Sequence, residues 1–351
     1  MPCTRPLIWP ARQSAAVFNV AIVGATGAVG STMIRVLEER GFPVTELRPL
    51  ASSRSAGTII DYLGKPFEVQ ELTENSFEGI QIALFSAGSE RARDFAPAAV
   101  EAGAVVIDNS SAFRTDPEVP LVVPEVNEGD IANHSGIIAN PNCVAAPLVV
   151  ALKPIADAVG IARVIVSSYQ AVSGTGQAAI EELRLQTAGY LVGDEPDPQV
   201  YPHPIAFNVL PHIDVFDDSG YTGEEVKVGN EARKMLHLPD LRVSATCVRV
   251  PVMYAHSQAV HIETIEPLDA AKAREILMLA PGAVVVDEPR ANAYPLPRDA
   301  AGRNEVFIGR IRNDASHPNG LALWIVADNL RKGAATNAVQ IAESLVMNGW
   351  L

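Results

Sequence analysis

The sequence predicts an α/β protein with a Rossmann-type, doubly wound parallel sheet, followed by a second α+β domain with a mixed sheet. A short apolar run, Phe18–Val23, leads directly into a glycine turn and then into a helical stretch closed by Gly41. Further short apolar runs follow, some separated by helix-like segments, and this alternation is typical of parallel sheets. After Cys143 the strand candidates are longer and follow one another, which favours a mixed or antiparallel sheet.

The individual elements can be placed in chain order. The first part has strand candidates at 18–23, 45–51, 80–85, 104–107 and 136–139, and helices at 31–40 and 91–102. The second part has a helix at 144–159 and strands at 163–170, 241–250, 259–266, 305–312 and 321–327. Small apolar residues at helical spacing predict a terminal helix within 329–348, and five prolines without a clear period predict a long loop at 192–218.

Size and composition restrict the possible functions. The 351 residues exceed the roughly 250–300 at which one hydrophobic core stops growing, so two domains are expected. Acidic residues outnumber basic ones by 41 to 27, a net charge of −14, and this disfavours nucleic acid and anionic membranes as partners. No apolar run approaches the ~20 residues that cross a bilayer, and residues 1–16 look like a loose tail rather than a signal peptide. Three cysteines without pairing rhythm favour a reduced, cytoplasmic compartment, and ligands at zinc-like spacing are absent, so no metal is expected.

The glycine turn predicts a dinucleotide site. Its glycines follow a G-x-x-G-x-x-G pattern between the first strand and the first helix, where backbone N–H groups can reach a pyrophosphate at the helix N-terminus. The residues concerned are Gly24, Ala25, Thr26, Gly27, Ala28, Val29 and Gly30. At the end of the second strand, where NAD-preferring proteins usually carry an acidic residue, this chain has Ser52, Ser53, Arg54 and Ser55. An arginine with hydroxyls and no carboxylate favours the 2′-phosphate of NADP(H).

A cysteine at a strand-to-helix junction is the candidate nucleophile. Cys143 ends the run Asn140-Pro141-Asn142-Cys143, directly before the expected helix, and a helix N-terminus favours the thiolate form. Taken alone, such a cysteine would more often be an inert core residue. His256, downstream, could exchange protons with the thiol and the reacting oxygen. Cys247 alternates with strand neighbours and is expected in the core.

At these residues the sequence resembles aspartate-β-semialdehyde dehydrogenase, from Val20 to the terminal helix. The resemblance is carried by the glycine turn, by Asn140–Cys143, and by further matches at Gln170, Ser173–Gly176, Glu224, Lys227, Arg249–Val252 and His256. It implies a homodimer that uses NADPH to reduce L-β-aspartyl phosphate to L-aspartate 4-semialdehyde, with release of phosphate. That reaction supplies lysine, methionine and threonine biosynthesis. The tail at 1–16 departs from the family's pattern. The implied domains are an NADP-binding domain at 17–142 with 329–351, and a catalytic and dimerisation domain at 143–328.

The resemblance also implies a role for each matching residue. Cys143 would be the nucleophile, His256 the general acid–base, and Gln170 would orient the intermediate. Arg249 would bind the substrate's α-carboxylate and Glu224 its α-ammonium, with Glu225 as the neighbouring alternative. Asn142 would belong to the substrate site, and Arg114 and Lys227 would bind phosphate. Ser173, Gly174 and Asn329 would lie near the cofactor. On sequence alone, Glu224 and Lys227 would rather be an i,i+3 surface pair, Arg114 could be a solvated loop residue, and Asn329 an ordinary helix cap.

Three other functions compete with this interpretation. N-acetyl-glutamyl-phosphate reductase shares the glycine turn and the cysteine, but usually has glycine where this chain has Asn142. Short-chain reductases and epimerases need a Tyr-x-x-x-Lys pair, which the sequence lacks. A non-enzymatic NADP-binding regulator would have no need of the cysteine, the histidine and both ion partners for a substrate.

Overall fold

The computed structural model describes residues 17–194 and 197–351 and divides into two compact units. The first comprises the described residues up to Pro141 together with Ala334–Leu351, and the second comprises Asn142–Gly333. The tail expected at 1–16 lies outside the described residues. Asn329, which the sequence placed with the nucleotide-binding domain, belongs to the second unit.

The first unit is built on six parallel strands in the order β5-β2-β1-β6-β7-β8. In chain order these are β1 (Phe18–Val23), β2 (Val44–Ala51), β5 (Gln70–Glu71), β6 (Ile82–Phe85), β7 (Val105–Asp108) and β8 (Ile137–Ala139). The strand order runs outward from β1 in both directions, so the carboxyl end of β1 is the point where ligands bind in such sheets. The doubly wound sheet that the sequence predicted is confirmed.

Helices cover both faces of this sheet, as the alternation of β1 side chains requires. Val20 and Ile22 belong to one core cluster with residues of α1 (Ala28–Arg40) and α9 (Thr336–Met347). Ala21 and Val23 belong to another cluster with residues of α2 (Ser89–Glu101). The smaller elements of this unit are the hairpin β3 (Ile59–Tyr62) and β4 (Lys65–Glu68), the short helix α3 (Pro124–Asn127), and two 3₁₀ turns at Glu74–Phe77 and Glu128–Asn133.

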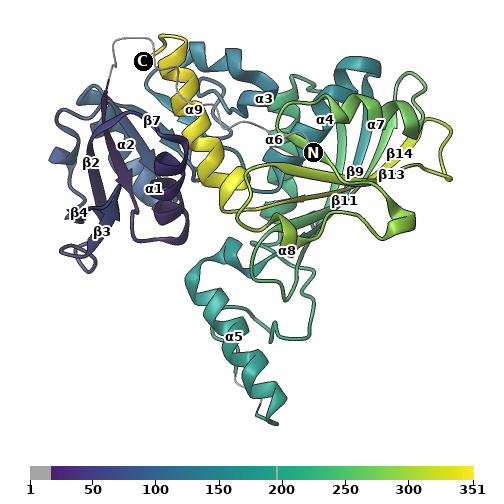
Figure 1. The fold of residues 1–351 in the computed structure, drawn as a ribbon, viewed down its shortest axis with the longest axis horizontal. Helices are drawn as coiled ribbons and strands as arrows, with labels where there is room; N and C mark the ends of the chain where they lie inside the picture. The colour runs from purple at the N-terminus through teal and green to yellow at the C-terminus, as the bar shows by residue number, and fades with distance from the viewer. Residues whose placement is uncertain (1–16, 195–196) are drawn as a thin grey trace. The chain divides into compact units, whose positions relative to one another are not determined.

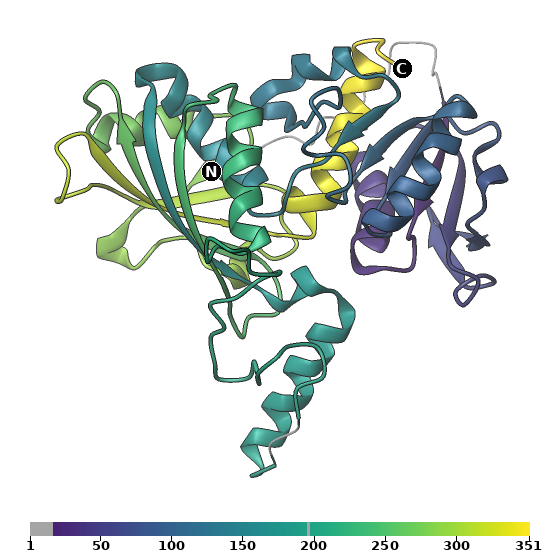
Figure 2. The ribbon, with the colours of Figure 1, turned by 180° about the vertical axis from the view of Figure 1, so that it is seen from behind.

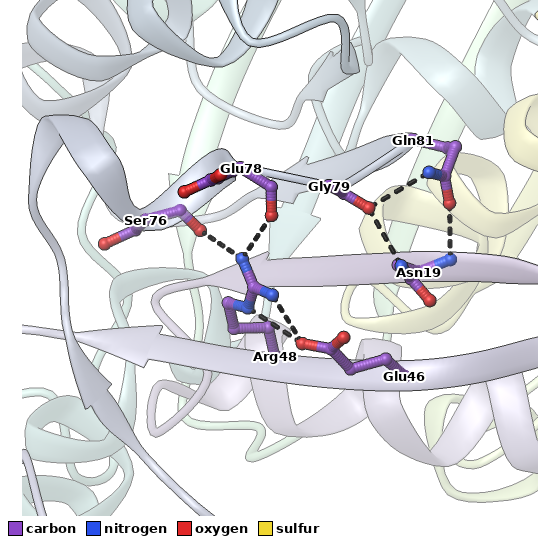
Figure 3. A network of polar contacts seen from close by, with 7 residues as sticks. All are labelled: Asn19, Glu46, Arg48, Ser76, Glu78, Gly79 and Gln81. Carbon is purple, nitrogen blue, oxygen red and sulfur yellow. Dashed lines mark hydrogen bonds and ion pairs between the residues drawn. The ribbon is translucent and has the colours of Figure 1, made fainter.

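A polar network joins the chain before β6 to the first two strands (Figure 3). Arg48 of β2 donates to the carbonyl oxygens of Ser76 and Glu78 at 3.0 and 2.9 Å. Asn19 of β1 donates from its backbone N–H to Gln81 Oε1 and from its side-chain amide to the carbonyl oxygen of Gly79. These bonds satisfy loop carbonyl groups that have no hydrogen-bond partner in a neighbouring strand. They also hold the residues before β6 beside β1.

The second unit contains a six-stranded mixed sheet in the order β10-β9-β11-β14-β13-β12. In chain order the strands are β9 (Ile161–Gln170), β10 (Arg242–Arg249), β11 (His256–Thr264), β12 (Ala283–Val285), β13 (Val306–Asn313) and β14 (Gly320–Ala327). The two outer pairs, β10 with β9 and β12 with β13, are parallel, and the three inner pairs are antiparallel. The predicted mixed sheet is therefore confirmed.

Helices pack on one face of this sheet, namely α4 (Ala145–Val159), α6 (Gly223–Leu236) and α7 (Ala270–Met278). Val164 and Val166 of β9 are buried, whereas Ile165 and Tyr169 on the opposite face are each 37% exposed. Helix α5 (Gln177–Leu191) extends away from the sheet (Figures 1 and 2). The described residues between α5 and α6, 192–194 and 197–222, contain no long element, as predicted for 192–218. The short helix α8 (Pro297–Ala300), 3₁₀ turns at Val172–Thr175 and Pro289–Ala291, and a π-helical turn at Arg331–Ala335 complete this unit. None of the described helices combines the length and hydropathy of a bilayer-spanning segment.

Candidate active site and nucleotide pocket

Two glycines of the G-x-x-G-x-x-G turn are required by close backbone approaches. Gly24 has φ +86°, and a Cβ there would stand 3.0 Å from backbone atoms of Ser86 at the end of β6. A Cβ on Gly30 would stand 2.2 Å from the carbonyl oxygen of Gly24, which no side chain could tolerate. The glycines thus permit the tight turn by which α1 begins directly after β1.

A cavity of about 550 Å³ lies at this turn in the first unit. Its lining comprises Gly24, Thr26, Gly27, Ala51, Ser52, Ser53, Arg54, Glu71, Leu72, Ser86, Ala87, Arg91 and Phe95. Among the predicted cofactor residues, Ala25, Ala28, Val29, Gly30 and Ser55 do not line it; most of them form the turn and helix behind it. Ser173, Gly174 and Asn329 do not line it either and belong to the second unit. Three polar residues of the lining were not predicted from the sequence. Ser86 and Arg91 follow β6, the strand beside β1 in the sheet. Glu71 adds one carboxylate to a lining that also contains Arg54 and Arg91.

Cys143 is held at the start of α4 by its neighbour Asn142. The side-chain oxygen of Asn142 accepts from the backbone N–H groups of Val144 and Ala145, at 2.7 and 3.3 Å. The backbone N–H of Asn142 donates to Glu231 at 2.6 Å, and Val144's carbonyl accepts from Gln258 at 3.0 Å. The peptide on each side of the thiol is therefore anchored, and Cys143 itself is partly exposed.

Glu224 connects this turn to Gln170 at the end of β9. The Asn142 amide donates to both carboxylate oxygens of Glu224, at 2.9 and 3.0 Å. Gln170 donates to one of these oxygens and to Ser168 Oγ, each at 3.2 Å. Glu224 is 7% exposed, so its charge is shielded from solvent and supported by amide donors rather than by bulk water.

Arg249 and His256 are both bonded to Ala171, the residue after Gln170. The Ala171 N–H donates to His256 Nδ1 at 3.0 Å, and its carbonyl oxygen accepts from Arg249 Nη1 at 2.8 Å. Arg249 is 5% and His256 1% exposed. Arg249 Nε and His256 Nε2 are buried and have no hydrogen-bond partner in the described residues. Burial, and secondly the charge of Arg249, hold the pKa of His256 well below its usual value of 6.5.

Because a backbone N–H can only donate, Nδ1 of His256 must be unprotonated. Nε2 of the neutral ring therefore carries the proton. It faces Gly174, on which a Cβ would stand 3.2 Å from Nε2 and 3.0 Å from Arg249 Nη1. The lack of a side chain at Gly174 keeps both groups uncovered on that side, so a small molecule could meet an N–H donor and a guanidinium together.

Asn329 serves a tertiary contact and does not cap a helix. Its side-chain oxygen accepts from Ser173 Oγ at 3.0 Å and from the backbone N–H of Ala255 at 3.1 Å. Ala255 has φ +69°, a conformation that costs free energy for a residue with a side chain, and it directly precedes His256. The helix expected to begin at Asn329 begins only with the π-helical turn at Arg331 and continues as α9.

The remaining predicted residues have partners of their own. Lys227 pairs with Asp214 at 2.5 Å, and this bond holds the pKa of Asp214 below its usual range. Glu225 forms a capping box with Thr222 and accepts from the backbone N–H of Cys247, so it belongs to the helix start. The structure thus favours Glu224 over Glu225 as the carboxylate that faces a substrate.

Cys247 and Arg114 are both buried. Burial raises the pKa of the Cys247 thiol to about 12, which makes it unreactive, as expected for a core cysteine. Arg114 belongs to the first unit, where it donates to the carbonyl oxygens of Asn140 and Asn109 at 2.9 and 2.8 Å.

Three residues that hold this site escaped the sequence analysis. Glu231 lies seven positions after Glu224 on the same helix, a spacing that places both on one face, so periodicity could have indicated it. Gly333 packs so tightly against Cys143 that a Cβ on it would stand 3.0 Å from Cys143 Cβ. Ala171 acts through its backbone alone. Neither of the last two carries a signal in the sequence.

Comparison with known proteins agrees with this geometry. Residues 19–134 match the family model of the semialdehyde dehydrogenase NAD binding domain, and residues 152–332 that of the semialdehyde dehydrogenase dimerisation domain. The aspartate-semialdehyde dehydrogenase of Aquifex aeolicus is 57% identical over 95% of this chain and 99% of its own. That of Bacillus subtilis is 52% identical over 93% and 97%. The crystal structure of aspartate semialdehyde dehydrogenase II from Vibrio cholerae, complexed with ASA, is 52% identical, covers 95% of this chain and 99% of its own, and superimposes with a TM-score of 0.93.

The doubly wound parallel sheet, the thiol at a helix start and these matches together place the chain among nicotinamide-dependent oxidoreductases. Its nicotinamide-binding domain is the part of the chain matched by the first family model. The chain belongs to the aspartate-semialdehyde dehydrogenase family. Its relatives are enzymes, which disfavours the non-enzymatic regulator.

Proposed function

We propose that this enzyme catalyses the NADPH-dependent reduction of L-β-aspartyl phosphate to L-aspartate 4-semialdehyde and phosphate, through a thioester on Cys143. The reaction would serve lysine, methionine and threonine biosynthesis. The observation that carries the proposal is the burial of two opposite charges, Glu224 and Arg249, in the unit that begins with the Cys143 turn. Buried charges of this kind need partners, and an α-amino acid supplies an ammonium and a carboxylate together.

Formation of the thioester follows from the anchored turn. The Cys143 thiolate would attack the β-carbonyl carbon, the bond from that carbon to the phosphate oxygen would break, and phosphate would leave with the bonding electrons. The start of α4 favours the thiolate, and the bonds of Asn142 and Val144 hold the attacking sulfur in one place.

NADPH, when bound, would supply the hydride that reduces the thioester carbonyl. The tautomer of His256 supports a role as proton donor to the carbonyl oxygen, because Nε2 carries the proton while Nδ1 accepts from Ala171. From the sequence, His256 was also expected to accept the proton of the thiol. In the resting tautomer, however, Nε2 already carries a proton and cannot accept another. In the collapse of the thiohemiacetal, the hydroxyl proton would return to His256 Nε2 while the carbon–sulfur bond breaks, which would release the aldehyde and return the thiolate.

For the substrate ion partners, the geometry supports Glu224 with the α-ammonium and Arg249 with the α-carboxylate. Asn142 would position Glu224 and the thiol, and Gln170 would orient the acyl group from its place beside Glu224. Arg114 and Lys227 remain the proposed phosphate-binding residues. Lys227 would have to exchange its bond with Asp214 for the phosphate, which the partial exposure of both side chains permits.

For the cofactor, we propose NADP(H) in preference to NAD(H). Arg54, Ser52 and Ser53 line the pocket at the end of β2, where a 2′-phosphate would be recognised. Within the described residues, no cluster of three or more metal-binding side chains is found, and the proposed reaction needs no metal.

We further propose a homodimer. The dimerisation-domain match covers most of the second unit, and its mixed sheet has one face that carries partly exposed apolar side chains, among them Ile165 and Tyr169. A second copy of the chain would bury them.

The rival substrate is N-acetyl-glutamyl phosphate. Its α-nitrogen is acylated and uncharged, so it would leave the buried Glu224 carboxylate without a counter-charge. This chemistry favours the aspartyl substrate, which has a free ammonium.

The test is phosphate-dependent oxidation of L-aspartate semialdehyde, followed by NADPH absorbance, with the wild type and Cys143→Ala. N-acetylglutamate semialdehyde serves as the control substrate. We expect NADPH formation with the first substrate and none in the variant, which should still bind NADPH. Activity confined to the control substrate would assign the chain to the other reductase, and full activity of Cys143→Ala would overturn the thioester.

A further inference from the structure

Arg249 is held from several sides by the segment that follows helix α5. Its backbone forms an antiparallel bridge with Leu210, in which each residue donates its N–H to the other's carbonyl at 2.8 to 2.9 Å. Its guanidinium carbon lies 5.8 Å from the centre of the Tyr201 ring, over the ring face. A ring at this distance attracts the cation and favours the position of the guanidinium over the ring.

The segment that carries Tyr201 is itself anchored. Glu182 of α5 accepts from the backbone N–H groups of Gln199 and Val200, at 2.8 and 2.5 Å. Gln186, one turn further along α5, accepts from the N–H groups of Ile205 and Ala206, at 2.8 and 3.1 Å. The backbone on both sides of Tyr201 is therefore held to α5, and this limits how far Tyr201 can move together with Arg249.

The Tyr201 hydroxyl provides a third anchor. It donates to Thr175 Oγ1 at 2.9 Å, in the turn that also carries Gly174. Burial raises the pKa of Tyr201, so the hydroxyl stays protonated and keeps this bond at neutral pH. Tyr201 thus connects the turn next to His256 with the guanidinium group of Arg249.

These contacts leave one edge of the guanidinium for a ligand. The guanidinium carbon lies over the Tyr201 ring, and Nη1 donates to the carbonyl oxygen of Ala171. Nε is buried without a partner in the described residues. A carboxylate bound side-on by Nε and Nη2 would satisfy it and form the bidentate geometry that arginine provides best.

We propose that Tyr201 is a positioning residue that holds the guanidinium of Arg249 in place and thereby determines recognition of the substrate's α-carboxylate. This proposal rests on the proposed function, since it assigns Arg249 to that carboxylate. It predicts that the ring, rather than the hydroxyl, carries most of the effect. It also predicts that only substrates with a carboxylate respond to loss of the ring.

The experiment compares Tyr201→Leu, which removes the ring, with Tyr201→Phe, which keeps it. Tyr190→Leu is the matched control, because Tyr190 is an exposed tyrosine of α5 whose ring packs on Phe207. The KM of L-aspartate semialdehyde, phosphate and NADP⁺ is measured for each protein. The same measurement is made with 3-aminopropanal, which has the amine and the aldehyde but no carboxylate.

Tyr201→Leu should raise the KM of L-aspartate semialdehyde about tenfold, in line with a desolvated cation–π contact. The KM of phosphate, of NADP⁺ and of 3-aminopropanal should not change, and Tyr201→Phe and Tyr190→Leu should resemble the wild type. An equal loss with both aldehydes, or a fall in kcat at unchanged KM, would overturn the proposal and leave Tyr201 a structural residue. A wild type without activity on L-aspartate semialdehyde would overturn the proposed function as well.

Discussion

The backbone N–H of Ala171 donates to Nδ1 of His256 at 3.0 Å, and this single bond determines which ring nitrogen of the histidine carries its proton. Burial and the nearby Arg249 hold the pKa of His256 well below 6.5, so the ring is neutral when folded. In the unfolded chain it would titrate near 6.5.

The first prediction concerns stability at acid pH. Between the lowered folded pKa and about 6.5 the unfolded state binds more protons, so stability rises with pH and is lost as pH falls through this window. The thermal midpoint of the wild type should therefore fall more between pH 7.5 and 5.5 than that of His256→Gln. His203→Gln, at an exposed position, is the control. Equal slopes for His256→Gln and the wild type would contradict the buried neutral histidine.

The second prediction concerns Gly333→Ala. The added methyl would stand 3.0 Å from Cys143 Cβ and 3.1 Å from its carbonyl oxygen, so the thiol must move. Displacement of a nucleophile by a fraction of an ångström should lower kcat by about tenfold or more. Gly129→Ala, which meets no atom within 4 Å, should behave as the wild type. The measurements are kcat and the rate of alkylation by iodoacetamide, and wild-type values for both in Gly333→Ala would refute the prediction.

The third prediction separates the two neighbouring glutamates of α6. Glu224→Gln keeps the shape but removes the charge, and the KM of L-aspartate semialdehyde should rise about ten- to hundredfold, the value of a charge-assisted hydrogen bond. Glu225→Gln should leave that KM unchanged, because glutamine also completes the capping box with Thr222. If instead the two variants exchange these results, Glu225 is the substrate carboxylate.

The fourth prediction concerns dinucleotide choice. Arg54→Ala should raise the KM of NADP⁺ about tenfold, since a charge-assisted contact to the 2′-phosphate would be lost. The KM of NAD⁺, which lacks this phosphate, should stay the same and serves as the internal control. A parallel rise for both dinucleotides would place Arg54 elsewhere on the cofactor.

Local patterns predicted much of the fold. The run Phe18–Val23 became a strand with the same bounds, and the order of strand, glycine turn and helix needed only neighbours in the sequence. The same holds for the helix after Cys143 and for the change to longer strands in the second unit. The strands β3 and β4 and the whole of helix α5 were missed, because polar or exposed residues give them little periodicity.

The site divides in the same way. The sequence by itself determined the residue types that we propose carry the chemistry, namely Cys143, Gln170, His256 and the ion partners, because nucleophile, acid and charge are properties of side chains. Only the tertiary structure decided the tautomer of His256, the choice of Glu224 over Glu225 and the contact of Tyr201 with Arg249. These features depend on backbone groups and aromatic rings that the fold brings together from distant segments, so no local sequence pattern predicts them.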